Sequence, residues 1–124
     1  MKQILVIEDD RDIQANLKEL LEDEGYAVTC MFNGQEALDH LRRGGRQPDL
    51  ILLDLMMPIC DGYAFRELQT RDPLLAGIPV RLMTAAAGVD LPRLLLNPRE
   101  VIRKPIDVDT LLGVLGQALA RIPA

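Results

Sequence analysis

The chain has 124 residues, enough for one domain with a core of its own. Hydrophobic residues make up 48% and aromatic residues only 3%, so an aliphatic core is expected, and no apolar stretch is long enough for a membrane span or a secretory signal. The net charge of -5 and the lack of a basic run argue against direct binding of nucleic acid.

The two cysteines, Cys30 and Cys60, are too few for a disulfide framework, and their spacing matches no metal site. We therefore expect reduced thiols in a cytoplasmic protein. We expect one domain over residues 1–124, a length that suits a complete protein as well as one domain cut from a longer chain.

Five short apolar runs are spaced along the chain. Runs that are apolar on both faces are typical of strands buried in a parallel sheet. They cover residues 4–7, 27–31, 50–53, 80–83 and 101–102. Segments of helical periodicity separate them, and the resulting alternation predicts an α/β fold, a doubly wound parallel sheet with helices on both faces.

Capping residues mark where these helices begin and end. The first helix is expected between Asp10 and Gly25, because an acidic residue suits a helix start and glycine a helix end. Asn33 is expected to begin the second helix, with Glu36 completing a capping box. Asp61, Asp90 and Asp107 are expected to cap the later helices.

The segment 85–100 has the weakest helical pattern. Pro92 and Pro98 interrupt it, so we expect a fourth helix that is short or irregular, over about residues 91–96. Asn97 precedes Pro98 and should leave the helical conformation.

Polar residues follow four of the five apolar runs. In an open parallel sheet, ligands bind beyond the carboxyl ends of the strands, so these residues should meet. They are Glu8, Asp9 and Asp10 after the first run, Asp54 after the third, Thr84 after the fourth, and Lys104 near the end of the fifth.

Together these residue types indicate a phosphoryl-transfer site. Carboxylates that share a cleft repel one another, and a hard divalent cation such as Mg²⁺ relieves the repulsion. A lysine and a hydroxyl would then bind the oxygens of a phosphoryl group, and Asp54 is the candidate nucleophile that forms an aspartyl phosphate.

Each residue also has a plain structural interpretation when it is taken alone. Glu8 and Asp9 could simply begin a helix, and we expect Asp10 to do only that. Thr84 could be an ordinary strand-end threonine, and Lys104 a surface lysine. The functional interpretation is favoured because the strand ends match as a set, and because an aspartate after Leu-Ile-Leu-Leu is costly without a partner.

In this order, the motifs resemble the receiver domain of two-component response regulators, the CheY-like family. The resemblance covers essentially the whole chain. The residues that carry it are Glu8-Asp9-Asp10, Asp54-Leu55-Met56-Met57-Pro58, Asp61-Gly62, Met83-Thr84-Ala85 and Lys104-Pro105.

The resemblance implies a flavodoxin-like three-layer sandwich, with a five-stranded parallel sheet in order 2-1-3-4-5 and five helices. It also implies that Asp54 accepts a phosphoryl group from a sensor histidine kinase or a histidine phosphotransfer protein. Such a domain changes the surface that it offers to a downstream effector. It catalyses only its own phosphorylation and dephosphorylation and is not otherwise an enzyme. Homodimers are common in the family.

The resemblance further assigns a role to each site residue. Asp9 would bind Mg²⁺ or Mn²⁺ directly, Glu8 would act nearby, often through water, and the backbone carbonyl of Met56 would be another metal ligand beside Asp54. Thr84 and Lys104 would each bond an oxygen of the phosphoryl group, and the Lys104-Pro105 bond would be cis.

The chain departs from the family at the expected output face. Many receivers have Tyr or Phe three residues before the lysine and Phe after the Lys-Pro pair, whereas this chain has Val101 and Ile106. With Pro92 and Pro98 nearby, these differences suggest the hypothesis that ordering of the fourth helix, rather than a ring flip, carries the signal.

Three other functions compete with that of a phosphorylated receiver. A metal-dependent phosphatase with an aspartate nucleophile commonly has a second aspartate two residues later, where this chain has Met56, which cannot donate a proton. A flavodoxin-like electron carrier conflicts with the acids after the first run and with the scarcity of aromatic residues. A protein-interaction module that is never phosphorylated remains the alternative.

Overall fold

The structure, a computed structural model, describes residues 1–120, so the predicted domain end at residue 124 lies outside the described residues. All five predicted strands are present. The strands are β1 (Gln3–Ile7), β2 (Ala27–Met31), β3 (Leu50–Asp54), β4 (Val80–Thr84) and β5 (Val101–Arg103). The helices of this part of the chain are α1 (Arg11–Asp23), α2 (Gly34–Arg42), α3 (Gly62–Arg71), α4 (Leu91–Leu94), the 3₁₀-helix η1 (Pro98–Glu100) and α5 (Val108–Ala120).

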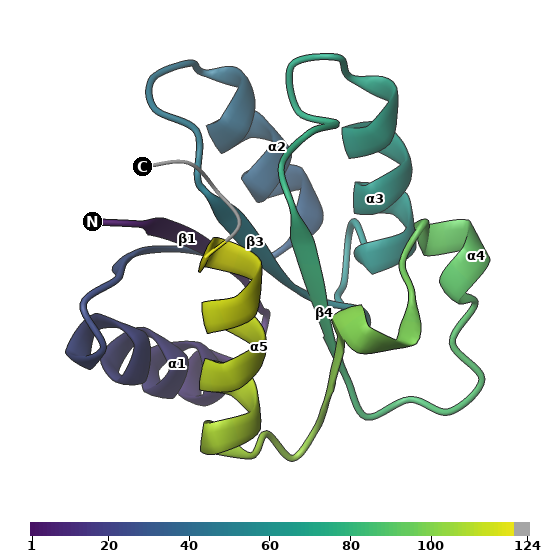
Figure 1. Ribbon diagram of the computed structural model, residues 1–124. Coiled ribbons are helices and arrows are strands. Elements are labelled where there is room, and N and C mark those ends of the chain that lie inside the picture. Colours follow the sequence, from purple (N-terminus) through teal and green to yellow (C-terminus); the bar gives the residue numbers. More distant parts are fainter. Residues whose placement is uncertain (121–124) are drawn as a thin grey trace.

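The strands form one parallel sheet in the order β2-β1-β3-β4-β5, which confirms the predicted doubly wound topology. Figure 1 shows α1 and α5 on one side of the sheet, α2 and α3 on the other, and α4 beside α3. The fold is therefore the three-layer sandwich that the sequence predicted. All five strands end at the same edge, which brings the residues that follow them together.

The core divides between the two faces of the sheet because successive side chains of a strand point in opposite directions. Leu5 and Ile7 pack in a cluster with residues of α2 and α3, whereas Ile4 and Val6 pack with residues of α1 and α5. The buried residues of both clusters are mainly aliphatic, with Phe65 the one aromatic ring among them, as the composition indicated. Burying one such side chain stabilises the fold by about 1.5–3 kcal/mol.

Asp10, Asp61, Asp90 and Asp107 each accept a hydrogen bond from a backbone N–H in the first turn of the predicted helix. Asn33 also caps α2, through Glu36 N–H at 2.9 Å. The predicted capping box is wrong in one detail, because the Glu36 carboxylate accepts from Phe32 N–H at 3.2 Å instead of from Asn33. A reciprocal capping box is formed by Asn97 and Glu100, which begins η1.

The fourth helix is short, as predicted, but it is a single turn that ends at Leu94 instead of extending to residue 96. Leu95 ends it by adopting a left-handed backbone with φ of 57°. Asn97 is extended, with φ of -106° and ψ of 166°, as expected for a residue that precedes proline.

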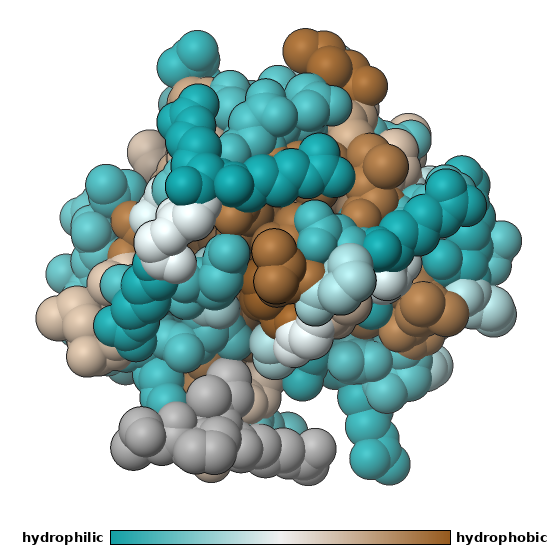
Figure 2. Space-filling view, turned by 90° about the horizontal axis from the view of Figure 1, so that it is seen from above, coloured by the Kyte–Doolittle hydropathy of each residue, from teal (hydrophilic) through white to brown (hydrophobic). Residues whose placement is uncertain are grey.

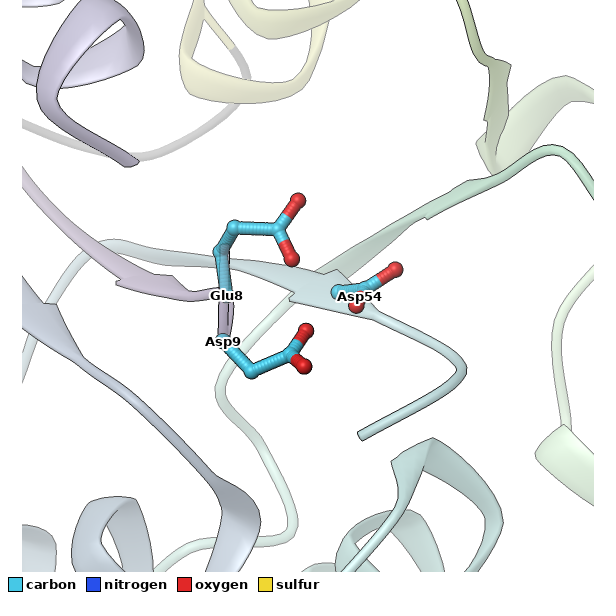
Figure 3. A group of neighbouring side chains, drawn as sticks. All are labelled: Glu8, Asp9 and Asp54. Carbon is cyan, nitrogen blue, oxygen red and sulfur yellow. The ribbon is translucent and has the colours of Figure 1, made fainter. Parts of the chain in front are cut away.

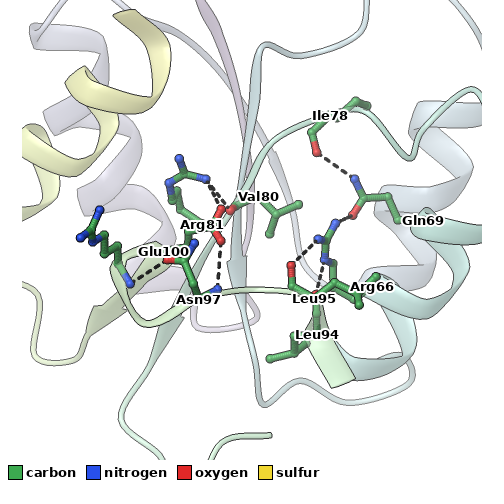
Figure 4. A network of polar contacts seen from close by, with 10 residues as sticks. Arg66, Gln69, Ile78, Val80, Arg81, Leu94, Leu95, Asn97 and Glu100 are labelled. Atoms are coloured by element: carbon green, nitrogen blue, oxygen red, sulfur yellow. Dashed lines mark hydrogen bonds and ion pairs between the residues drawn. The ribbon is translucent and has the colours of Figure 1, made fainter. Parts of the chain in front are cut away.

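A buried arginine on α3 holds α4 in place. The Arg66 side chain donates hydrogen bonds to the backbone carbonyl of Leu94 at 2.7 Å, the carbonyl of Leu95 at 3.4 Å and the Gln69 side chain at 2.9 Å. Burial lowers the pKa of Arg66, and the charge of Glu100 opposes that effect. We call this set the arginine network; it comprises Arg66, Gln69 and the carbonyls of Leu75, Ile78, Leu94 and Leu95. Figure 4 shows all of these residues except Leu75.

The loops that lead into β3 and β4 lie at the top of Figure 1, so the edge of the sheet at which the strands begin faces upward in that view. Figure 2 shows this edge as mostly hydrophilic, with hydrophobic residues in separate spots. Among residues 1–120, no helix is long and apolar enough to cross a membrane.

Candidate functional site

A cavity of about 290 Å³ lies at the edge where the strands end. Every residue that the sequence predicted for the site lines it. These residues are Glu8, Asp9, Asp54, Met56, Thr84 and Lys104. The structure thus brings together side chains that are up to 96 residues apart in the chain.

Strand register places these residues side by side. Ile7 of β1 lies opposite Leu53 of β3, so Glu8 and Asp54 are the next residues of neighbouring strands. Thr84 ends β4, and its carbonyl accepts a hydrogen bond from the Lys104 backbone N–H at 3.0 Å. The Lys104-Pro105 bond is cis, as the family resemblance implied.

Three carboxylates form the acid cluster, which we define as Glu8, Asp9 and Asp54. One carboxylate oxygen of each residue lies within 4.8 Å of the other two. Figure 3 shows their side chains turned toward a shared space. Glu8 is fully buried and Asp54 is 4% exposed, whereas Asp9 faces solvent.

Lys104 is the cation that the structure places against this cluster. Its Nζ lies 2.6 Å from Glu8 Oε1 and 3.1 Å from Asp54 Oδ1. Burial lowers the pKa of Lys104, but the hydrogen bond to Glu8 and the charge of Asp54 outweigh burial, so the net shift is upward. The ammonium therefore stays charged, and one positive charge faces three carboxyl groups.

Two observations show that the acid cluster lacks positive charge. Glu8 Oε2 is buried and has no hydrogen-bond partner among the described residues. Burial and then the neighbouring Glu8 raise the pKa of Asp54 to about 7, although Lys104 acts in the opposite direction. An unsatisfied carboxylate oxygen and a repelled carboxyl group are what a hard divalent cation would stabilise, so the residues present fit Mg²⁺.

Thr84 is 2% exposed, and its hydroxyl oxygen accepts a hydrogen bond from Ala86 N–H at 3.0 Å. The hydroxyl proton remains available for an oxygen that enters the cavity. Arg103 donates to the Ala86 carbonyl from the end of β5, so the loop after β4 is tied to the neighbouring strand. Val101 is half-buried, at the position where many receivers have an aromatic ring.

The loop between β3 and α3 contains a feature that the sequence did not predict. Ile59 has a φ of 69°, and Cys60 N–H donates to the Pro58 carbonyl at 2.7 Å, which closes a γ-turn around Ile59. A β-branched residue at positive φ is strained. Glycine is the usual sequence signal for such a backbone, and here it is missing.

Gln14 of α1 was also not predicted. It is 7% exposed, and its side-chain Nε2 donates to the Glu8 carbonyl at 3.2 Å and to the Met31 carbonyl at 3.0 Å. In the sequence it is only a polar residue beside the apolar stripe of a helix. No signal in the sequence reveals that these two strand-end carbonyls lie within its reach.

Comparison with known proteins agrees with this architecture. Residues 4–115 match the family model of the response regulator receiver domain, and the chain therefore belongs to this family. Protein Rrf1 of Nitratidesulfovibrio vulgaris is 32% identical over 118 residues, which cover 95% of this chain and 83% of Rrf1. The recognition made from the sequence motifs is thus confirmed.

Solved structures agree as well. The receiver domain of a signal transduction histidine kinase from Syntrophus aciditrophicus is 30% identical, with a TM-score of 0.81 over 100% of this chain and 96% of that one. The receiver domain of the sensor histidine kinase PA1611 from Pseudomonas aeruginosa is 25% identical, with a TM-score of 0.83 over 96% and 98% of the two chains. That structure has a magnesium ion coordinated in its active-site cleft.

The chain spans only part of several other relatives. It covers 50% of some and 26% of others, all of them transcriptional regulatory proteins of greater length. What this chain has in common with them is the receiver domain of two-component systems.

Proposed function

We propose that this receiver is a phosphorylation-operated switch in which Asp54 accepts a phosphoryl group. The observation that carries the proposal is the convergence of three carboxylates, one lysine and one threonine hydroxyl on a single cavity. Asp54 is the carboxylate at the centre of this group, because it ends β3, which lies between β1, the strand that leads into Glu8 and Asp9, and β4, the strand that ends at Thr84. Membership of the receiver family supports the same role.

The proposed reaction transfers a phosphoryl group from a phosphohistidine to Asp54. A carboxylate oxygen of Asp54 attacks phosphorus, a P–O bond forms, and the P–N bond to the imidazole breaks. The imidazole nitrogen keeps the electron pair and takes up a proton. Lys104 and Thr84 bind oxygens of the transferred group, and water later hydrolyses the aspartyl phosphate to inorganic phosphate. The protein thereby acts on its own side chain and turns over no separate substrate.

The acid cluster, together with the backbone carbonyl of Met56, would hold Mg²⁺ or Mn²⁺. When bound, the cation neutralises negative charge on the carboxylates and on the phosphoryl oxygens. The buried, unpartnered oxygen of Glu8 supports this assignment. The magnesium ion in the PA1611 receiver domain supports it by analogy.

We propose that the phosphodonor is a sensor histidine kinase or a histidine phosphotransfer protein. A downstream effector would then recognise the phosphorylated surface. The relatives that are transcriptional regulatory proteins favour a role in the control of transcription for the pathway. A cytoplasmic location follows for a domain that meets such partners. The alternative, a phosphate-independent interaction module, has the same fold but needs none of the site chemistry.

Mass spectrometry of the intact protein tests the proposal. The protein is incubated with acetyl phosphate and Mg²⁺, beside a sample with EDTA and beside the Asp54→Asn variant. We expect one added phosphate in the wild type only, and only with metal. No added mass in the wild type would support the interaction module instead, and equal phosphorylation of the variant would show that Asp54 is not the acceptor.

A further inference from the structure

Gln14 connects the ends of two strands through its side chain. Its Nε2 donates to the backbone carbonyl of Glu8, the first residue after β1, and to the carbonyl of Met31, the last residue of β2. The side chain is buried, and both acceptors lie at the edge that carries the acid cluster. The Met31 carbonyl also accepts from Glu8 N–H at 3.0 Å, so the two strand ends are closely tied.

The Glu8 carbonyl belongs to the peptide group that joins Glu8 to Asp9. In an extended strand, adjacent side chains point to opposite faces. Nevertheless, oxygens of Glu8 and Asp9 both lie within 4.8 Å of one Asp54 oxygen. The strand ends at Ile7 and the chain bends at Asp9, and the Gln14 amide donates a hydrogen bond of 3.2 Å to the peptide group that precedes this bend.

We infer that Gln14 is a positioning residue for the cation site. It does not contact the cation, but it holds the peptide group that aims two of the three carboxylates. This inference rests on the proposed function, because it presupposes that the acid cluster binds a divalent cation. Residues that orient metal ligands typically change metal affinity by about 10–100-fold when they are replaced.

The chain contains a matched control in Gln69 of α3. Its Nε2 also donates to two backbone carbonyls, those of Leu75 at 3.1 Å and Ile78 at 3.0 Å, and its side chain is also buried. Both acceptors precede β4, at the opposite edge of the sheet from the acid cluster. Loss of Gln69 therefore removes the same kind of bond far from the site, and it also removes the acceptor for Arg66, so it is the more severe of the two changes for stability.

The test is a titration with Mg²⁺ of the wild type, Gln14→Met and Gln69→Met, followed by amide NMR shifts. Methionine keeps the length of glutamine but donates no hydrogen bond. We expect Gln14→Met to weaken Mg²⁺ binding by about tenfold or more, whereas Gln69→Met stays within about twofold of the wild type. Urea unfolding of each variant shows whether stability alone explains the change.

Gln14→Asn is a second variant for the case that Gln14→Met does not fold. It keeps the donor on a shorter side chain, and we expect an affinity between those of the wild type and Gln14→Met. Wild-type affinity in a folded Gln14 variant, or equal weakening in Gln69→Met, would overturn the positioning role. If the wild type itself binds no Mg²⁺, the proposed cation site fails as well, which separates the two claims.

Discussion

Two cations of this protein, the half-buried Lys104 and the buried Arg66, are held in opposite ways. Lys104 lies against two carboxylates, Glu8 and Asp54, with a third carboxylate nearby. Arg66 lies among neutral acceptors, two backbone carbonyls and the Gln69 amide, and the described residues place no carboxylate within ion-pair distance of it.

The difference separates a functional cluster from a structural one. In the arginine network, the Arg66 guanidinium reaches three acceptors, and the carbonyls that it binds end α4 (Figure 4). At the site, a buried Glu8 oxygen has no partner among the described residues, and the pKa of Asp54 is raised to about 7. Excess negative charge that costs stability is a common mark of a site built for a ligand.

Removal of the arginine should give the largest change in stability. Arg66→Met leaves buried carbonyls without donors, and we expect a loss of about 2–4 kcal/mol in the free energy of unfolding. The loss should be the same with and without Mg²⁺, and phosphorylation by acetyl phosphate should persist in the folded protein. Urea denaturation measures it. A loss that Mg²⁺ reverses would show that the two clusters are coupled.

The pH dependence of stability should come from the acid cluster. The pKa of Asp54 is about 7 in the folded protein, above its ordinary value of 3.8, so the folded state binds more protons between these values. In EDTA, its contribution should therefore fall as pH rises from about 4 to 8, by roughly 2 kcal/mol.

The control for this prediction is Asp54→Asn, which cannot titrate. It should unfold at higher urea than the wild type at pH 8 and should lose much of the pH dependence. If the wild type instead becomes more stable than this variant as the pH rises from 5 to 8 in EDTA, the raised pKa of Asp54 in the acid cluster is contradicted.

Removal of the lysine should give a smaller change that depends on conditions. Lys104→Met leaves Glu8 and Asp54 without their cation, and we expect a loss of about 1–2 kcal/mol in EDTA. Mg²⁺ should restore much of it, unlike the loss in Arg66→Met, and phosphorylation should be slower at every concentration of acetyl phosphate. Paired unfolding curves with EDTA and with Mg²⁺ measure this contrast. Equal losses of unfolding free energy with EDTA and with Mg²⁺ would show that Lys104, like Arg66, has a structural role.

The smallest expected effect concerns the strained loop beside the site. Ile59→Gly relieves a positive φ of 69° in a β-branched residue, and we expect a gain of about 0.5–1 kcal/mol after the entropy cost of glycine. Leu95→Gly, at φ of 57° beside the arginine network, is the matched control and should gain less, because leucine is not β-branched. A loss of stability in Ile59→Gly would show that the side chain has an unrecognised contact.

The sequence predicted the acid site better than the arginine network for a physical reason. Parallel strands end at one edge of the sheet, so residues that follow the apolar runs are expected to meet there. This rule alone predicts that Glu8, Asp54 and Lys104 line one cavity, as they do. Arg66 gives no such signal, because an arginine on a helix is usually exposed. Two of its three acceptors are backbone carbonyls 28 and 29 residues away, which no residue identity reveals.

The same limit applies to Gln14 and to Ile59. Gln14 acts through the carbonyls of Glu8 and Met31, so its role depends on the relative positions of α1, β1 and β2. Ile59 adopts a backbone conformation with positive φ, for which glycine is the usual sequence signal. A short fourth helix over about residues 91–96 was predicted, since Pro92, Asn97 and Pro98 act locally, but its earlier end at Leu94 depends on the left-handed Leu95.

The central claim is that Asp54, and no other carboxylate of the cluster, accepts the phosphoryl group. The most direct test is localisation of the phosphate by tandem mass spectrometry after digestion at low pH, where acyl phosphates survive. We expect the phosphate on Asp54 when Mg²⁺ and acetyl phosphate are present. Phosphate on Glu8 or Asp9, or on a residue outside the cavity, would contradict the account.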